Sequence, residues 1–238
     1  MLTDHTRLTQ WGSWEGTITV DGEDLTVTAG SVPGTRDRSW GVRPVGEQLA
    51  VLRQPMPFQV FWLWAPLHFE DRFTHYAFHE HEDGRRWLET AQILDPLPAG
   101  ASPCSRVGVR ECYDIGYELE WKPGRREIQR AHLWFTDSIE GETHIELETL
   151  YTFRMRGIGY WHPHWGHGSN HGQYEIGRES IRLDDFDPTD FASLHLQNVV
   201  KASMGERTGI GVVEQIAIGP HTPSGLTGFM DGHQKIAT

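Results

Sequence analysis

An alternation of apolar and polar residues over residues 144–155 constrains the fold more than any other feature. One set of alternate positions holds Ile145, Leu147, Thr149, Tyr151, Phe153 and Met155, and the other holds His144, Glu146, Glu148, Leu150, Thr152 and Arg154. Successive side chains of an extended chain point to opposite faces, so a period of two separates the two sets. The segment therefore predicts a half-buried β-strand, with Tyr151 and Phe153 on its buried face.

Other segments predict further strands. Asp21-Gly22 joins two β-rich runs and predicts a hairpin, because a type I′ turn needs positive φ at both central residues. Residues 58–65 are apolar at successive positions, which indicates a strand buried on both faces. Strands are also expected at residues 117–121, 173–183, 195–202 and 209–218, and one short helix at residues 188–193, with Asp187 as its cap.

Many antiparallel strands joined by short turns favour a barrel or a sandwich over a layered α/β fold. The 10 tryptophans and 26 glycines agree with many strands, tight turns and large rings that fill a core or line a cavity. We therefore expect an all-β chain, an antiparallel lipocalin-like β-barrel or a strongly bent sandwich with one short helix. Residues 1–238 form a single domain in this interpretation.

The charge balance limits the partners of such a barrel. Asp plus Glu number 33 against 21 Lys plus Arg, and the formal net charge of −12 repels nucleic-acid phosphates and anionic lipids. The longest apolar stretch, residues 60–67, is far shorter than the roughly 20 residues that span a bilayer. Residues 1–11 show no secretory signal, and Cys104 and Cys112 fit free thiols better than a disulfide. We expect a cytoplasmic protein with no nucleic-acid partner and no membrane insertion, and a homodimer is one option for its assembly.

A dense group of charges occupies residues 34–43. Arg36, Asp37, Arg38 and Arg43 lie there between glycines, with Trp40 among them. On an extended chain Asp37 and Arg43 share one side, and Arg36 and Arg38 share the other with Trp40. Neighbouring arginines favour the charged form of Asp37, which makes it an anchor rather than a proton donor. Two interpretations stay open: an ion-pair cluster that closes one end of a barrel, and a reactive site.

A second carboxyl group lies on an apolar strand face. Glu214 shares a face with Ile210, Val212, Ile216 and Ile218. Burying an unpaired charge is too costly, so Glu214 must be neutralised, paired or solvated. Either burial raises its pKa, which suits a general acid, or an arginine of residues 36–43 pairs with it.

Two histidine clusters raise the question of a metal. His162, His164, His167 and His171 lie within ten positions, at a spacing that could bind Zn²⁺, Fe²⁺ or Cu²⁺. No nearby carboxylate or cysteine completes a recognised ligand pattern, and neighbouring tryptophans favour a packing role. On a strand over residues 74–82, His75, His79 and His81 would share one face, which we interpret as a polar rim. We expect neither a metal nor another cofactor.

Residues 34–43, Gly-Thr-Arg-Asp-Arg-Ser-Trp-Gly-Val-Arg, resemble the Gly-x-Arg-Asp-His-Ser-Trp-Gly-x-Arg signature of the carotenoid 1,2-hydratase (hydroxyneurosporene synthase) and AttH-like superfamily. Residues 160–168 and 213–221 resemble further segments of its members, and the similarity covers roughly residues 8–232. The resemblance implies a lipocalin-like barrel around an apolar pocket, normally as two barrel-like halves, and the addition of water to isoprenoid double bonds or help in polyene cyclisation. Two departures are Arg38 in place of histidine, and a chain that resembles mainly the C-terminal half.

Together these features predict a cofactor-independent enzyme that binds a terpenoid- or steroid-like molecule in a barrel pocket and catalyses acid-assisted hydration, isomerisation or cyclisation of an alkene. The expected catalytic residues are Asp37, implied by the resemblance, and Glu214, with Arg38 and Arg43 orienting Asp37. The expected substrate-binding residues are Trp40, Trp62, Trp64, His164 and His167. A non-catalytic carrier of hydrophobic ligands and a histidine-dependent metalloenzyme are the alternatives.

Overall fold

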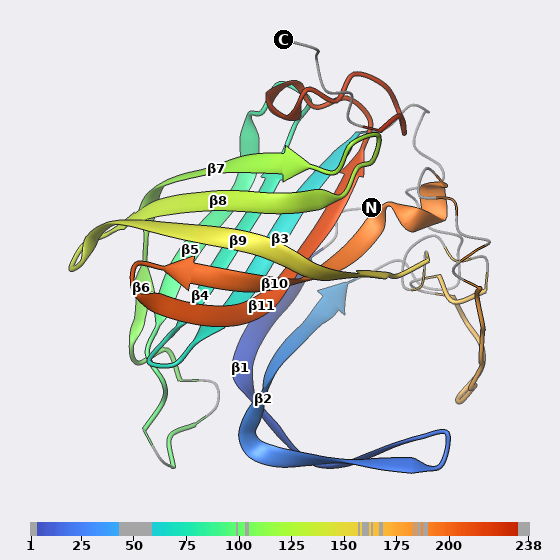
Figure 1. The fold of residues 1–238 in the computed structure, drawn as a ribbon, viewed down its shortest axis with the longest axis horizontal. Helices are drawn as coiled ribbons and strands as arrows, with labels where there is room; N and C mark the ends of the chain where they lie inside the picture. Colours follow the sequence, from blue (N-terminus) through green and yellow to red (C-terminus); the bar gives the residue numbers. More distant parts are fainter. Residues whose placement is uncertain are drawn as a thin grey trace.

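The computed structural model describes residues 4–42, 59–98, 100–102, 105–156, 158, 162, 164–166, 169–182, 184, 187 and 190–232. A long two-stranded ribbon, β1 (Asp4–Val20) and β2 (Glu23–Val42), precedes a nine-stranded antiparallel sheet (Figure 1). The strands of that sheet are β3 (Val60–Phe69), β4 (Phe73–Glu80), β5 (Arg86–Leu94), β6 (Val109–Glu111), β7 (Tyr113–Trp121), β8 (Ile128–Asp137), β9 (Gly141–Arg154), β10 (His195–Met204) and β11 (Arg207–Ile218). Their spatial order is β6-β5-β4-β3-β11-β10-β9-β8-β7. The predicted all-β fold is confirmed.

The sheet curls into a nearly closed barrel because its two edge strands are consecutive in the chain. Cys112 alone separates β6 from β7, so the polypeptide passes directly from one edge of the sheet to the other. Side chains complete the seam: the Tyr76 hydroxyl donates to the carbonyl of Gly116, and Arg86 Nη1 donates to the carbonyl of Ile115 at 2.5 Å. Bonds from β4 and β5 thus hold β7 in place across the seam.

Packed side chains fill the barrel interior. Residues from every strand from β3 to β11 except the short β6 enter one apolar cluster, and its largest members that are less than 2% exposed are Phe61, Leu67, Tyr76, Phe78, Ile93, Phe135, Ile128 and Ile145. Large rings make such a core dense, as in small barrels whose interior is just wide enough for side chains. The cavities described below lie at the barrel mouth and outside its wall, whereas the sequence led us to expect an apolar pocket inside.

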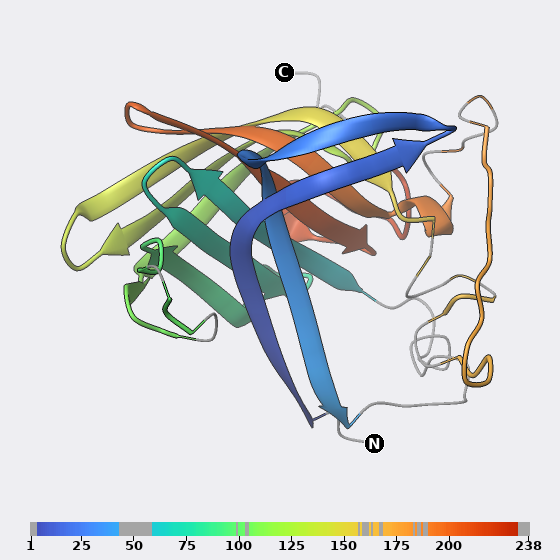
Figure 2. The same cartoon turned by 90° about the horizontal axis from the view of Figure 1, so that it is seen from below.

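The ribbon lies against the outer wall of the barrel. Figure 2 shows that it bends sharply, so that its two arms run in different directions. Thr35 Oγ1 lies 2.9 Å from His68 Nε2 of β3, and the Trp11 ring packs on Phe73 and His75 of β4. The Asp21-Gly22 turn has positive φ at both residues, as the hairpin signal predicted.

Strand β9 departs from its predicted alternation. Val199 of β10 pairs with Tyr151 and Val200 pairs with Thr149, so Leu150 is an extra residue, a β-bulge. A one-residue shift exchanges the two faces. Thr152 is therefore buried, and Tyr151 and Phe153 are 60% and 53% exposed, opposite to the expectation.

Two further expectations are wrong. Residues 173–182 contain no strand, and in place of the short helix there is a 3-10 turn, η3 (Phe191–Ser193), capped by Asp190 rather than Asp187. A second 3-10 turn is η4 (Thr222–Ser224), and the described residues contain no α-helix. None of them forms a helix of the length and apolarity that a membrane span requires. Cys112 is a free thiol, and Cys104 lies outside the described residues.

Candidate functional site

The outer wall beneath the ribbon brings together four residues that the sequence selected, namely Asp37, Trp62, Trp64 and Glu214. Trp62 and Trp64 point outward from β3, because the alternate residues of this strand point into the core. The guanidinium carbon of Arg7 lies 5.5 Å from the ring centre of each tryptophan, and ring faces attract cations. Asp37 accepts two hydrogen bonds from Arg7, both of 2.8 Å. This bidentate pair holds a carboxylate and a guanidinium beside the two indoles.

Glu214 joins the same wall through the strand register. It pairs with Trp64 across β11 and β3, and register partners in adjacent antiparallel strands lie side by side. Its carboxylate Oε1 lies 2.8 Å from Nε2 of His195 in β10, and both side chains are buried. The partner is thus a histidine rather than Arg36 or Arg38. His195 was not among the residues selected from the sequence, because strand register decides which side chains meet.

Two histidines extend this wall onto β4. The His75 ring lies 5.6 Å from Trp11 and 6.2 Å from Trp64, and the His79 ring lies 5.6 Å from Trp62. Burial lowers the pKa of each imidazole to about 4. Both are therefore neutral near pH 7 and belong to an aromatic layer, not to the polar rim that the sequence suggested.

A largely apolar cavity of about 530 Å³ lies next to this wall, between the ribbon and β4–β6. Its apolar lining comes from Trp11, Trp14, Phe73, Leu94, Pro96, Leu97, Val107 and Val109, and its polar lining includes Thr9, Gln10, Thr35 and Arg36. The volume and the lining suit a small hydrophobic ligand. Neither Arg7 nor Asp37 lines the cavity, but Thr9, the register partner of Asp37 in the ribbon, and Arg36, its neighbour in the chain, both do.

The other selected residues lie elsewhere. Arg38 projects from the opposite face of β2, 5.7 Å from the Trp40 ring, which is 48% exposed. We had expected Arg38 to orient Asp37, but among the described side chains it is Arg7 that donates the two hydrogen bonds to this carboxylate. Arg43 and His167 lie outside the described residues. His164 belongs to a histidine cluster described below.

The barrel mouth holds a polar cluster that sequence reasoning did not select. Glu80 accepts hydrogen bonds from Tyr117 at 2.6 Å, from Arg86 at 3.1 Å and from His221 at 2.9 Å, beside a cavity of about 580 Å³. Ser224 Oγ lies 2.8 Å from the other nitrogen of His221. Burial would raise the pKa of Glu80, but its three hydrogen-bond partners outweigh burial and hold the pKa below its usual value. The sequence did contain a signal for Glu80, since it is a carboxyl group on an otherwise apolar strand face, as Glu214 is.

One group of described side chains could hold a metal ion. Donor atoms of His164, His171 and Glu175 all lie within 4.8 Å of one another. Glu175 supplies the carboxylate that the histidine spacing lacked, and His162 pairs with another, Glu179, at 2.8 Å. Folding thus brings to these histidines the acidic partners that no short motif revealed.

The comparisons with known proteins give a family and a distant structural likeness. The model of a family of unknown function, DUF8625, matches residues 1–227. The chain is similar in structure to kievitone hydratase from Nectria haematococca, with a TM-score of 0.43 and 13% identity over 85% of this chain and 49% of that one. The chain thus spans about half the length of that structure. No curated protein matches the sequence.

Proposed function

We propose a function for a chain that belongs to DUF8625, a family of unknown function: it binds a terpenoid- or steroid-like molecule beneath the β1–β2 ribbon and catalyses acid-assisted hydration, isomerisation or cyclisation of an alkene. The observation that carries this proposal is the apolar cavity of about 530 Å³ beneath the ribbon. Its lining residue Thr9 is the register partner of Asp37, and its lining ring Trp11 packs on His75, which contacts Trp64 of the tryptophan wall.

The wall suits a reaction that passes through a carbocation. The faces of Trp62 and Trp64 already hold the positive charge of Arg7, so they present their electron-rich surfaces toward the ribbon. The carboxylate of Asp37 adds a negative charge beside them, which would help to stabilise a developing cation. Substrate would enter by displacing the guanidinium from the rings.

A proton is the second requirement. The hydrogen bond between His195 and Glu214 holds a proton next to Trp64, and we assign this pair the role of acid. Protonation of one alkene carbon leaves the cation on the other, and the oxygen of a water molecule adds to it. The proton that this water loses goes to Asp37 or back to the pair. Loss of a neighbouring proton instead gives isomerisation, and attack by a second alkene gives cyclisation.

The test uses farnesol and testosterone as alkene-containing probes. We expect binding to change the tryptophan fluorescence, and mass spectrometry to find a product that has gained one water or an isomer of the same mass. Asp37→Asn and Glu214→Gln should still bind but lose at least ~100-fold in turnover, in line with general acid catalysis. Glu118→Gln, at the barrel mouth, is the control. Full turnover in both variants would refute the mechanism.

A carrier is the second candidate, because the structure gives each nominated carboxylate a firm partner, Arg7 for Asp37 and His195 for Glu214. The same experiment separates the two functions. A carrier returns both probes chemically unchanged, and its affinity depends on Trp11 and Phe73 of the cavity rather than on Asp37.

A further inference from the structure

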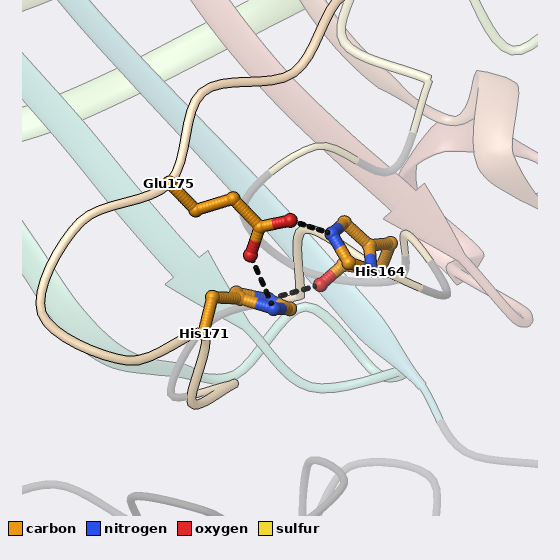
Figure 3. Close-up of side chains that lie close together, drawn as sticks. All are labelled: His164, His171 and Glu175. Atoms are coloured by element: carbon orange, nitrogen blue, oxygen red, sulfur yellow. Dashed lines mark hydrogen bonds and ion pairs between the residues drawn. The ribbon is translucent and has the colours of Figure 1, made fainter.

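We propose that His164, His171 and Glu175 form a binding site for Zn²⁺ that leaves one coordination position open. The site is separate from the ribbon cavity, since none of its residues lines that cavity. It lies in the segment between β9 and β10, and the three side chains converge on a common point in Figure 3.

The distances suit one small cation. Nε2 of His164 lies 3.0 Å from Oε1 of Glu175, and Nδ1 of His171 lies 3.1 Å from Oε2 of the same carboxylate (Figure 3). Ligands bound to one tetrahedral zinc at roughly 2.0–2.2 Å are separated from one another by about 3.4 Å. The two histidine–carboxylate distances are within a few tenths of an ångström of this value, and all three donor atoms lie within 4.8 Å of one another.

The hydrogen bonds of His171 turn its Nδ1 toward Glu175. Nε2 of His171 lies 2.7 Å from the carbonyl oxygen of His164, which can only accept a hydrogen bond, so Nε2 carries a proton. The other ring nitrogen, Nδ1, faces a carboxylate oxygen of Glu175, so a shared metal ion could bind to both. Ligating histidines commonly donate their other N–H to a backbone carbonyl in this way.

Packing around Trp165 holds the two segments that carry the site close together, one with His164 and one with His171 and Glu175. The Trp165 ring lies 4.4 Å from the His164 ring and 5.2 Å from the His171 ring. The same indole packs on Gly177, where an added Cβ would lie 2.1 Å from Trp165 Cζ2. This contact packs the segment that follows Glu175 against Trp165, which lies next to His164 in the chain. His162 accepts backbone N–H groups of His164 and Trp165 through Nδ1 and therefore shapes the turn.

The ligand set defines the class of metal. Two imidazoles and one carboxylate are a common set for zinc with three protein ligands, in which water or a substrate atom takes the fourth position. Another histidine pair, His132 and His144 with ring nitrogens 2.9 Å apart, lies on the β8–β9 surface. Glu146 lies 3.7 Å from His132 and Glu142 lies 3.5 Å from His144, but among the described residues no third donor atom lies within 4.8 Å of both histidines. The pair therefore serves as the matched control.

The test measures metal content and affinity in the untagged full chain. We expect one zinc per chain by elemental analysis, ligand-field bands on titration with Co²⁺, and at least ~100-fold weaker binding in His171→Gln and Glu175→Gln, because even outer-shell partners are worth ~10–100-fold. His144→Gln should bind as the wild type does, and circular dichroism checks that each variant folds. Absence of zinc binding in the wild type would overturn the proposal, and so would loss of binding in His144→Gln with retention in His171→Gln. None of these readouts depends on turnover of an alkene.

Discussion

Glu80 and Glu214 show how far a single residue can be interpreted from sequence. Each is a carboxyl group on an otherwise apolar strand face, and each is buried with a histidine as partner. The burial of Glu214 followed from periodicity alone. The partners did not, because His221 lies 141 residues from Glu80 and reaches it only after the barrel has formed.

Replacement of Glu80 by glutamine should destabilise the fold by about 3 kcal/mol. The variant leaves the buried His221 and the partly buried Arg86 without their anion, and breaking a buried pair by removing one partner costs roughly 3–5 kcal/mol. Urea unfolding measures the change. Glu118→Gln at the same mouth is exposed and should stay within about 0.5 kcal/mol of wild type. Equal effects in both variants would contradict the assigned role of Glu80.

The two neutral histidines of the wall make stability depend on pH. Their folded pKa of about 4 lies below the usual 6.5, so the unfolded chain binds more protons between these values. Stability should therefore fall as the pH drops from about 6.5 to 4. Below about 4.5 the lowered pKa of Glu80 adds a further loss, since protonation breaks its ion pairs. Urea midpoints at several pH values test this, and a His75→Gln, His79→Gln double variant should flatten the upper part of the curve.

At the scale of elements, several strands were predictable and their irregularities were not. The hairpin, β7, β10 and β11 follow from alternation and turn residues, because these signals are local. The bulge at Leu150 in β9 has no local signal, since it depends on how β9 and β10 fit together. The same holds for the close approach of β11 to β3, which only the folded sheet reveals.

Gly211→Ala should weaken the contact between β11 and β3. An added Cβ would lie 2.4 Å from the carbonyl oxygen of Pro66 and 2.9 Å from Cα of Leu67, and backbone atoms cannot move aside as a flexible side chain can. We expect a loss of about 1–3 kcal/mol, typical of overpacking. Thermal unfolding measures it. Gly12→Ala in β1 is the control, because nothing lies within 4 Å of its added Cβ. Unchanged stability in Gly211→Ala would mean that the two strands can separate without cost.

For the whole molecule, the barrel could be predicted but the position of its candidate site could not. Apolar strands and short turns indicate a closed sheet, whereas whether its interior is hollow depends on how completely rings from opposite walls meet. Phe61, Tyr76, Phe78 and Phe135 fill it, so the tryptophans that we expected to line an inner pocket lie on the outside. The ribbon then supplies the second wall of the cavity.

This arrangement predicts that stability and ligand binding respond to different residues. Phe135 is fully buried inside the barrel, so Phe135→Leu should reduce stability by roughly 1–2 kcal/mol through lost packing, without affecting the affinity for farnesol. Trp11 lines the cavity beneath the ribbon, so Trp11→Ala should weaken that affinity about tenfold, because an aromatic contact and its buried area are lost. Urea unfolding and fluorescence titration of both variants separate the two effects. If Phe135→Leu weakened binding as much as Trp11→Ala, the ligand would have to enter the barrel itself, and the cavity under the ribbon would not be its site.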